Sequence, residues 1–137
     1  MKCTGAKLSL AIFTIKIYSI CIMYDESNIF AKIIRSEIPC IKVYEDEFVL
    51  AFQDIAPAAP VHVVVIPKGQ YCSFDDFAEK AEPSEFSRFF KAIRSIAHQC
   101  GLQQNGYRIV TNHGPDGGQT VFHFHVHILG GKKLSGL

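Results

Sequence analysis

Residues 117–131 read Gly-Gly-Gln-Thr-Val-Phe-His-Phe-His-Val-His-Ile-Leu-Gly-Gly. Three of the six histidines of the chain, His123, His125 and His127, stand at every second position of this stretch. In an extended strand, successive side chains point to opposite faces of the sheet. The sequence therefore predicts a strand from Val121 to Leu129, with the three imidazoles on one face and the intervening apolar side chains on the other.

Such a row of imidazoles suits either a zinc site or proton chemistry. Two histidines two positions apart on a strand can share one zinc ion, so a zinc hydrolase using His123 and His125 is one interpretation. At a rise of roughly 3.3 Å per residue, the outer two lie about 13 Å apart and cannot share an ion bound at about 2 Å. Imidazole, with an ordinary pKa of about 6.5, can attack, donate or accept a proton near neutral pH. We therefore favour a nucleophile, donors and acceptors arranged along one extended anion; three buried structural histidines are the plainer alternative.

The stretch before this strand is a connector rich in turn residues. Residues 112–120 contain three glycines within five positions. Glycine allows positive φ and close backbone approach, as a nest of N–H groups around a phosphate requires. Thr120 stands three residues before His123, where its hydroxyl or amide could reach a phosphate oxygen or a leaving group. A plain hairpin turn would need no ligand, so both interpretations stay open at this point.

Length, charge and cysteine usage limit the class of protein. A chain of 137 residues fits a single domain. The net charge is +1 and there is no basic run, so the chain lacks the electrostatic footprint of a nucleic-acid-binding protein. The five cysteines are odd in number and include no Cys-x-x-Cys pair, which indicates neither a disulfide framework nor a zinc knuckle. We expect a reducing, cytoplasmic location.

The N-terminal segment differs from the rest of the chain. An apolar run extends from Leu8 to Met23, and its first half resembles the apolar part of a signal peptide. No Ala-x-Ala-like cleavage site follows and the length is marginal for a membrane span, so we expect neither secretion nor a membrane anchor. Alternation over 13–18 also allows an amphipathic strand. We expect 1–22 to be an N-terminal extension, either disordered or upstream of the true start, and 23–137 to be the domain.

The remaining sequence predicts two helices and four more strands. Apolar residues recur at helical spacing over 28–37 and over 83–100, with Gly101 as the C-terminal cap of the second helix. Strands are expected over Lys42–Tyr44, Phe48–Asp54, Val61–Ile66 and Tyr107–Thr111. Gly69–Glu82 shows no clean period, so it predicts a loop with one helical turn at most. This order predicts an α+β domain with a mainly antiparallel sheet and its helices on one side.

A further histidine, His62, interrupts the β-branched run 61–66, which predicts a central strand buried on both faces. Leaving a buried polar group unpaired costs about 1–3 kcal/mol. We therefore expect His62 to have a partner, an imidazole of the histidine strand being the best candidate.

The pattern Asn-x-Gly-x-x-Gly-Gly-Gln-Thr-Val-Phe-His-Phe-His-Val-His-Ile-Leu-Gly-Gly resembles the signature of the histidine triad (HIT) family, in particular its nucleotide-binding, nucleoside phosphoramidase branch. The similarity extends upstream through Ile29–Pro39, Phe52–His62 and Val65–Lys68. The resemblance implies a five-stranded sheet in each subunit, with two helices, and a homodimer that joins two sheets into one of ten strands.

The resemblance also implies an activity, the hydrolysis of purine nucleoside 5′-phosphoramidates of the adenylyl-amine type. His125 would be the nucleophile and form a nucleotidyl-histidine intermediate. His127 would stabilise the charge on the phosphate, while His123 and His62 would supply the supporting proton network. The implied nucleotide-binding residues are Asp54 at the ribose, Asn112, Gly118 and Thr120 around the phosphate and leaving group, and Phe30, Ile33, Phe52 and Ile55 at the base. This scheme needs no metal or cofactor.

The chain departs from the pattern of the family at a few positions. Some members carry a zinc-binding cysteine pair where this chain has Asn28 and Ala31, so that structural zinc site is not expected. Val61 replaces a residue that is often small or hydroxylated, and His113 adds a histidine beside the connector. Two other functions remain open: a different HIT activity on dinucleoside polyphosphates, by hydrolysis or nucleotidyl transfer, and a nucleotide-binding adaptor with little turnover.

Overall fold

The computed structural model describes residues 23–136. The expected N-terminal extension, 1–22, and the amphipathic strand considered within it lie outside the described residues. No helix in the described part of the chain is long and apolar enough to cross a membrane.

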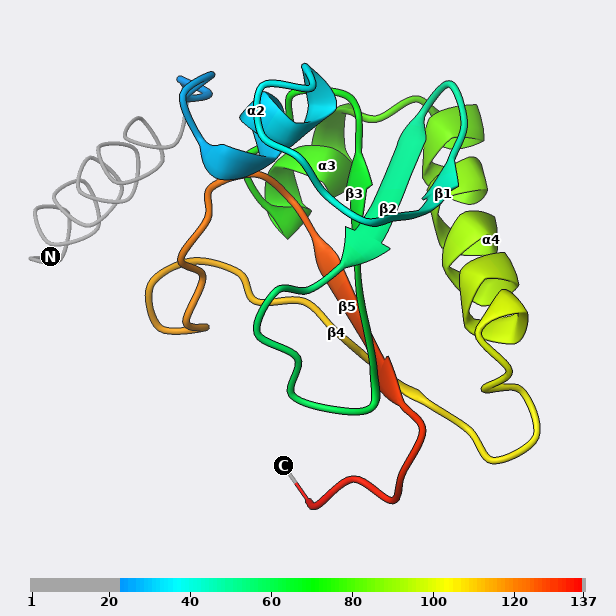
Figure 1. Ribbon diagram of the computed structural model, residues 1–137. Coiled ribbons are helices and arrows are strands. Elements are labelled where there is room, and N and C mark those ends of the chain that lie inside the picture. Colours follow the sequence, from blue (N-terminus) through cyan, green and yellow to red (C-terminus); the bar gives the residue numbers. More distant parts are fainter. Residues whose placement is uncertain (1–22, 137) are drawn as a thin grey trace, which may run out of the picture.

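In the described part of the chain, five strands form a single antiparallel sheet, whose arrangement Figure 1 shows. They are β1 (Lys42–Glu45), β2 (Val49–Gln53), β3 (Val61–Pro67), β4 (Arg108–Val110) and β5 (Val126–Gly130). Their order across the sheet is β1-β2-β3-β5-β4, so the β-branched run of β3 lies at the centre, as predicted. The antiparallel, five-stranded α+β fold expected from the sequence is therefore confirmed.

The strand predicted over 121–129 is much shorter than expected. β5 begins only at Val126, and the residues before it leave the sheet. The amide of Phe124 donates to the carbonyl of Tyr71 over 2.7 Å, in the loop after β3, instead of extending the β3–β5 ladder. At this end of β3 lies Pro67, which has no N–H to offer a continued ladder. The prediction was therefore wrong for residues 121–125, although they remain close to the sheet.

Helices α2 and α4 form where the apolar spacing predicts them. α2 (Ile29–Ile34) is capped by the side chain of Asn28, which accepts from the amide of Ala31. It ends earlier than expected because Ser36 adopts a φ of 61° and the amide of Glu37 turns back to the carbonyl of Lys32, as in a Schellman motif. α4 (Pro83–Gln99) begins with a proline and is followed by Gly101 at φ 75°.

Residues 23–136 contain a third helix, α3 (Phe74–Lys80), where a loop with one helical turn was expected. Ser73 caps it by accepting from the amide of Asp76, and Asp75 also stands in the first turn. A capping serine followed by acidic residues is a local signal for a helix start, which the prediction from apolar periodicity alone did not use.

Two cores lie on the two faces of the sheet, so the expectation that all helices cover one side was wrong. The larger core contains Phe77 of α3 and the apolar stripe of α4. The smaller one packs Phe30 and Ile33 of α2 against side chains of β2 and β3 on the other face. Strand alternation separates the two sets, because Val63 and Val65 join the first core while Val64 and Ile66 join the second. α2 therefore covers the second face of the sheet.

Candidate active site

The histidines lie on the face of the sheet that α2 covers. Phe124, Val126 and Ile128, the apolar members of the alternating stretch, belong to the larger core on the opposite face. The rings of His125 and His127 lie 5.1 Å apart between centroids. The predicted separation of apolar and imidazole side chains is therefore confirmed, even though only part of this stretch is a strand.

His123 is completely buried and both of its ring nitrogens are engaged. Its side chain is 0% exposed. Nε2 lies 2.8 Å from the carbonyl oxygen of Pro67, and because a carbonyl can only accept, Nε2 carries the proton. Nδ1 therefore accepts, and it meets the hydroxyl of Tyr24. His123 has no ring nitrogen left for a substrate, which makes it a supporting group.

His125 is held in the opposite tautomer. Its Nδ1 lies 2.7 Å from the backbone carbonyl of His123, so Nδ1 carries the proton and Nε2 keeps its lone pair. The ring of Phe30 stands edge-on to it with centroids 5.0 Å apart, and the hydroxyl of Thr111 donates to its carbonyl over 2.8 Å. The ring is thus fixed by its neighbours as an imidazole that has a nucleophilic nitrogen.

His62 and His127 form a short chain of oriented imidazoles. The amide of Ala58 donates to Nδ1 of His62 over 3.0 Å, so the proton of His62 sits on Nε2. That nitrogen lies 2.9 Å from Nδ1 of His127 and 3.4 Å from a carboxylate oxygen of Asp54. His127 therefore accepts at Nδ1 and carries its proton on Nε2, ready to donate to an anion. The expected imidazole partner of His62 is confirmed.

Burial favours the neutral form of His123, His125 and His127. Desolvation lowers the pKa of His123 to about 4. Desolvation, together with repulsion from His125 and His62, lowers the pKa of His127 to about 4. The pKa of His125 is also below its ordinary value, for the same first reason. A neutral His125 is the form that can attack phosphorus.

The donor chemistry of these histidines does not suit a metal ion. Asp54, His62 and His127 bring ligand-type atoms within 4.8 Å of one another. A metal at Nε2 of His62 would need a lone pair there, yet Nδ1 already uses its lone pair to accept from Ala58. Ligating histidines normally donate from their second nitrogen instead. In the pair His123 and His125, considered above for zinc, Nε2 of His125 is free, but both ring nitrogens of His123 are already hydrogen-bonded, so the two rings cannot share an ion.

The residues expected at the base and ribose divide into two groups. Phe30, Ile33 and Phe52 pack together in the smaller core beside the histidines. Ile55 is 96% exposed, in the loop after β2, and does not join them. Asp54 lies beside His62, where a cavity of about 350 Å³ opens between the ends of β2 and β3.

The residues expected at the phosphate lie in the connector between β4 and β5. Within the described residues, no hydrogen bond or ring contact links Asn112, Gly118 or Thr120 to the four imidazoles. Gly118 adopts a φ of 77°, which glycine allows freely. A Cβ on Gly117 would lie 2.3 Å from the carbonyl oxygen of His113, so the fold of the connector requires glycine there.

Two polar residues that support the site were not singled out from the sequence. Gln119 is buried; its side-chain oxygen accepts from the amide of Gly114 over 2.9 Å and its NH₂ donates to the carbonyl of Cys72 over 2.7 Å. Gln119 therefore stabilises the turn of the connector through Gly114 and holds the connector against the residues just before α3 through Cys72. Gln119 follows the glycine pair 117–118 just before the histidine stretch, and this position could have marked it as a supporting residue. The contact of Tyr24 spans 99 positions of the chain and had no local signal.

Comparison with known proteins agrees with this arrangement. The family model for the HIT domain matches residues 35–134. The chain belongs to the HIT family. An uncharacterized HIT-like protein of Rickettsia prowazekii is 54% identical over 115 residues, which cover 84% of this chain and 96% of that protein. The purine nucleoside phosphoramidase of Escherichia coli K12 is 42% identical over 109 residues, 80% of this chain and 91% of the enzyme. A crystal structure of a histidine triad protein from Clostridium difficile, 47% identical, superposes with a TM-score of 0.76 over 84% of this chain and 99% of that one.

Proposed function

We propose that this HIT protein hydrolyses purine nucleoside 5′-phosphoramidates through a nucleotidyl intermediate on His125. The observation that carries the proposal is the bond from Nδ1–H of His125 to the carbonyl of His123, which leaves Nε2 unprotonated. The similarity to the purine nucleoside phosphoramidase of Escherichia coli supports the substrate class. The fit of the histidines to proton chemistry supports a mechanism without a metal.

In the first step, Nε2 of His125 attacks the α-phosphorus while the bond from phosphorus to the amine breaks. The amine leaves with one proton taken from water. The nucleotidyl-imidazolium that results keeps its Nδ1–H on the carbonyl of His123, which stabilises the positive charge. Nε2–H of His127 donates to the phosphate oxygens as their charge develops. In the second step water displaces His125 from phosphorus and returns the proton that the amine took up.

We assign the nucleotide to the expected residues. Asp54 would accept from the ribose hydroxyls beside its own contact with His62. Phe30, Ile33, Phe52 and Ile55 would wall the base, and Asn112, Gly118 and Thr120 the phosphate. The bond from the amide of Ala58 fixes the tautomer of His62, which makes His62 an orienting group for His127.

The test is mass spectrometry of enzyme quenched during turnover of the adenosine 5′-phosphoramidate of lysine. We expect an AMP adduct on His125, absent in His125→Ala and retained in His98→Ala, which removes a histidine of α4 outside the site. An adduct on His127 instead would overturn the assigned roles. Turnover of a dinucleoside polyphosphate without any phosphoramidate hydrolysis would favour the other HIT activities, and tight AMP binding without turnover would favour an adaptor.

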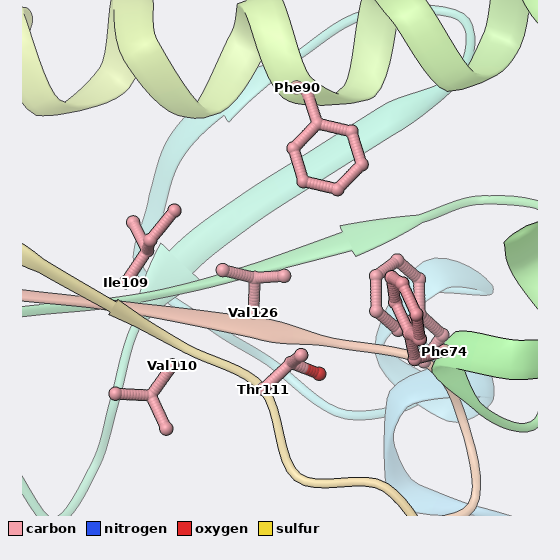
Figure 2. Close-up of a pocket in the computed structure, with 7 residues that line it drawn as sticks. Phe74, Phe90, Ile109, Val110, Thr111 and Val126 are labelled. Atoms are coloured by element: carbon pink, nitrogen blue, oxygen red, sulfur yellow. The ribbon is translucent and has the colours of Figure 1, made fainter.

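We also propose a homodimer built through the β4 edge of the sheet. In the described part of the chain β4 pairs with β5 alone, so its other edge is available to a second strand. Ile109, in the middle of β4, is 51% exposed. An apolar cavity of about 150 Å³ lies beside this edge. Figure 2 shows Ile109, Phe90 of α4 and Phe74 of α3 among the residues that line it. This cavity lies on the face of the larger core, away from the imidazoles, which suits a protein partner better than the nucleotide.

We place the protein in the cytoplasm, as its cysteine usage suggests. Cys40 and Cys100 are free thiols, and burial raises the pKa of both, so neither is activated.

A further inference from the structure

The hydroxyl of Tyr24 completes the hydrogen bonding of the most buried imidazole of the site. Nε2–H of His123 donates to the carbonyl of Pro67, which leaves the lone pair of Nδ1 inside the protein. The hydroxyl of Tyr24 meets that nitrogen and is the donor in the contact, because Nδ1 can only accept. The two rings also meet edge to face, with centroids 5.5 Å apart.

Tyr24 is held in place by the turn that begins α2. The amide and hydroxyl of Ser27 donate to a carboxylate oxygen of Asp25 over 2.8 and 2.6 Å. The side chain of Asn28 donates to the carbonyl of Asp25 over 2.7 Å while it caps the helix. The residues between Tyr24 and α2 are therefore fixed, and the hydroxyl is presented to His123 by an ordered segment.

His123 joins this contact to the nucleophile. Its ring is held by Tyr24 and Pro67, and its backbone carbonyl accepts from Nδ1–H of His125 over 2.7 Å. We propose that Tyr24 is a positioning residue, whose hydroxyl holds His123 so that this carbonyl keeps His125 in the tautomer with a free Nε2. The role rests on the function proposed above, since it concerns the attack by His125.

Removing the hydroxyl would leave the Nδ1 lone pair of His123 buried without a donor. Buried unpaired polar groups are avoided in folded proteins, so the ring would turn towards another donor. This turn moves residue 123 and weakens the bond that its carbonyl makes with His125. His125 would then populate the tautomer with its proton on Nε2, which cannot attack phosphorus. The loss falls on the chemical step rather than on nucleotide binding.

The experiment compares Tyr24→Phe with Tyr44→Phe in the full chain. Tyr44 lies on β1 and donates its hydroxyl to Asp46, so the control removes the same atom away from the site. For Tyr24→Phe we expect kcat on the lysine phosphoramidate to fall about tenfold with KM within about twofold of wild type. We expect both parameters to be unchanged in Tyr44→Phe.

Ring ¹⁵N NMR of His125 provides the second measurement and needs no turnover. Wild type and Tyr44→Phe should show a protonated Nδ1 and a free Nε2, and Tyr24→Phe should show a mixture of both tautomers. A wild-type His125 spectrum in Tyr24→Phe would overturn the proposal, even if kcat fell. If wild type hydrolysed no phosphoramidate, the proposed function would fail, while the NMR comparison would still decide whether Tyr24 sets the tautomer.

Discussion

Single hydrogen bonds assign a proton to one nitrogen in each of four imidazoles. Two of these assignments come from carbonyl acceptors, those of Pro67 and His123, and one from the amide of Ala58. The fourth follows because His62 must donate to His127. Since each ring is fixed by a backbone group or by another ring, the fold itself prepares one nucleophile and one donor.

The pH dependence of activity follows from the neutral state of these rings. The pKa of His127 is lowered to about 4. Burial also lowers the pKa of His125 below its ordinary value. The attacking form of His125 should therefore stay populated as the pH falls through 7. We expect kcat/KM to be constant from about pH 8 to about pH 6.5 and to decline only below that range.

Initial rates in buffers of constant ionic strength would measure this profile. His98→Asn, which removes a histidine outside the site, should give a profile that overlays that of wild type. A limb centred above pH 6.5 would contradict the assignment of a neutral, buried nucleophile.

Stability should depend on pH through His123. Its pKa is about 4 in the folded protein and about 6.5 when unfolded, so between these values the unfolded chain binds more protons. The stability that neutral His123 contributes is complete above about pH 6.5 and is lost as the pH falls towards 4. From pH 7 to pH 5 the loss should be about 1–2 kcal/mol.

Urea unfolding at pH 7 and pH 5 would test this dependence. His123→Asn should lower stability at pH 7 but reduce its difference between the two pH values, whereas His98→Asn should keep the wild-type difference. An equal pH dependence in wild type and His123→Asn would show that His123 does not carry it.

At the scale of elements, the backbone conformation of the connector between β4 and β5 depends on Gly117. A Cβ on Gly117 would meet the carbonyl oxygen of His113 at 2.3 Å, and a backbone atom cannot move aside cheaply. Gly117→Ala should therefore distort the connector, raise KM for the phosphoramidate about tenfold or more, and leave the sheet intact.

Gly136→Ala is the matched control, because nothing lies within 4 Å of a Cβ at Gly136. It should leave KM unchanged. Circular dichroism and thermal unfolding of both variants would separate a local effect on the connector from loss of the fold. Wild-type KM in Gly117→Ala would mean that the connector does not hold the phosphate.

The elements that the sequence predicted well are those with local signals. The central strand, the long helix α4 and the β1–β2 hairpin follow from apolar periodicity and caps. β5 was predicted five residues too early because alternation at 121–125 is preserved without a ladder. What ends the ladder is the bond from Phe124 to Tyr71, which lies far away in sequence. α3 was missed because its sequence has no clean apolar period, and the capping signal at Ser73 was not considered.

The candidate site divides in the same way. Alternation and spacing were enough to single out His123, His125 and His127 and the need of His62 for a partner. The identity of that partner, the tautomers of His123 and His127, and the contact of Tyr24 arise from chain segments 56 to 99 positions apart. Such contacts leave no local pattern, so only the folded structure reveals them.

At the scale of the whole molecule, one face of the sheet carries the larger core and the other carries the candidate active site. The larger core lies under α3 and α4, and α2 covers the other face of the sheet (Figure 1). On that second face, Phe30 of α2 meets the rings of His123 and His125. β4 lies at the edge of the sheet, where Ile109 is half exposed beside an apolar cavity. Because β4 is short and solvent-exposed, pairing with a second copy would cover both its backbone groups and this cavity.

The homodimer can be tested by charging this edge. Ile109→Lys places an ammonium group where two apolar edges would meet, so we expect a monomer by size-exclusion chromatography with light scattering. Ile41→Lys is the matched control: Ile41 is 66% exposed and lies next to β1, at the opposite edge of the sheet. It should remain dimeric. A dimer in both variants would move the interface away from β4, and a monomeric wild type would remove it altogether.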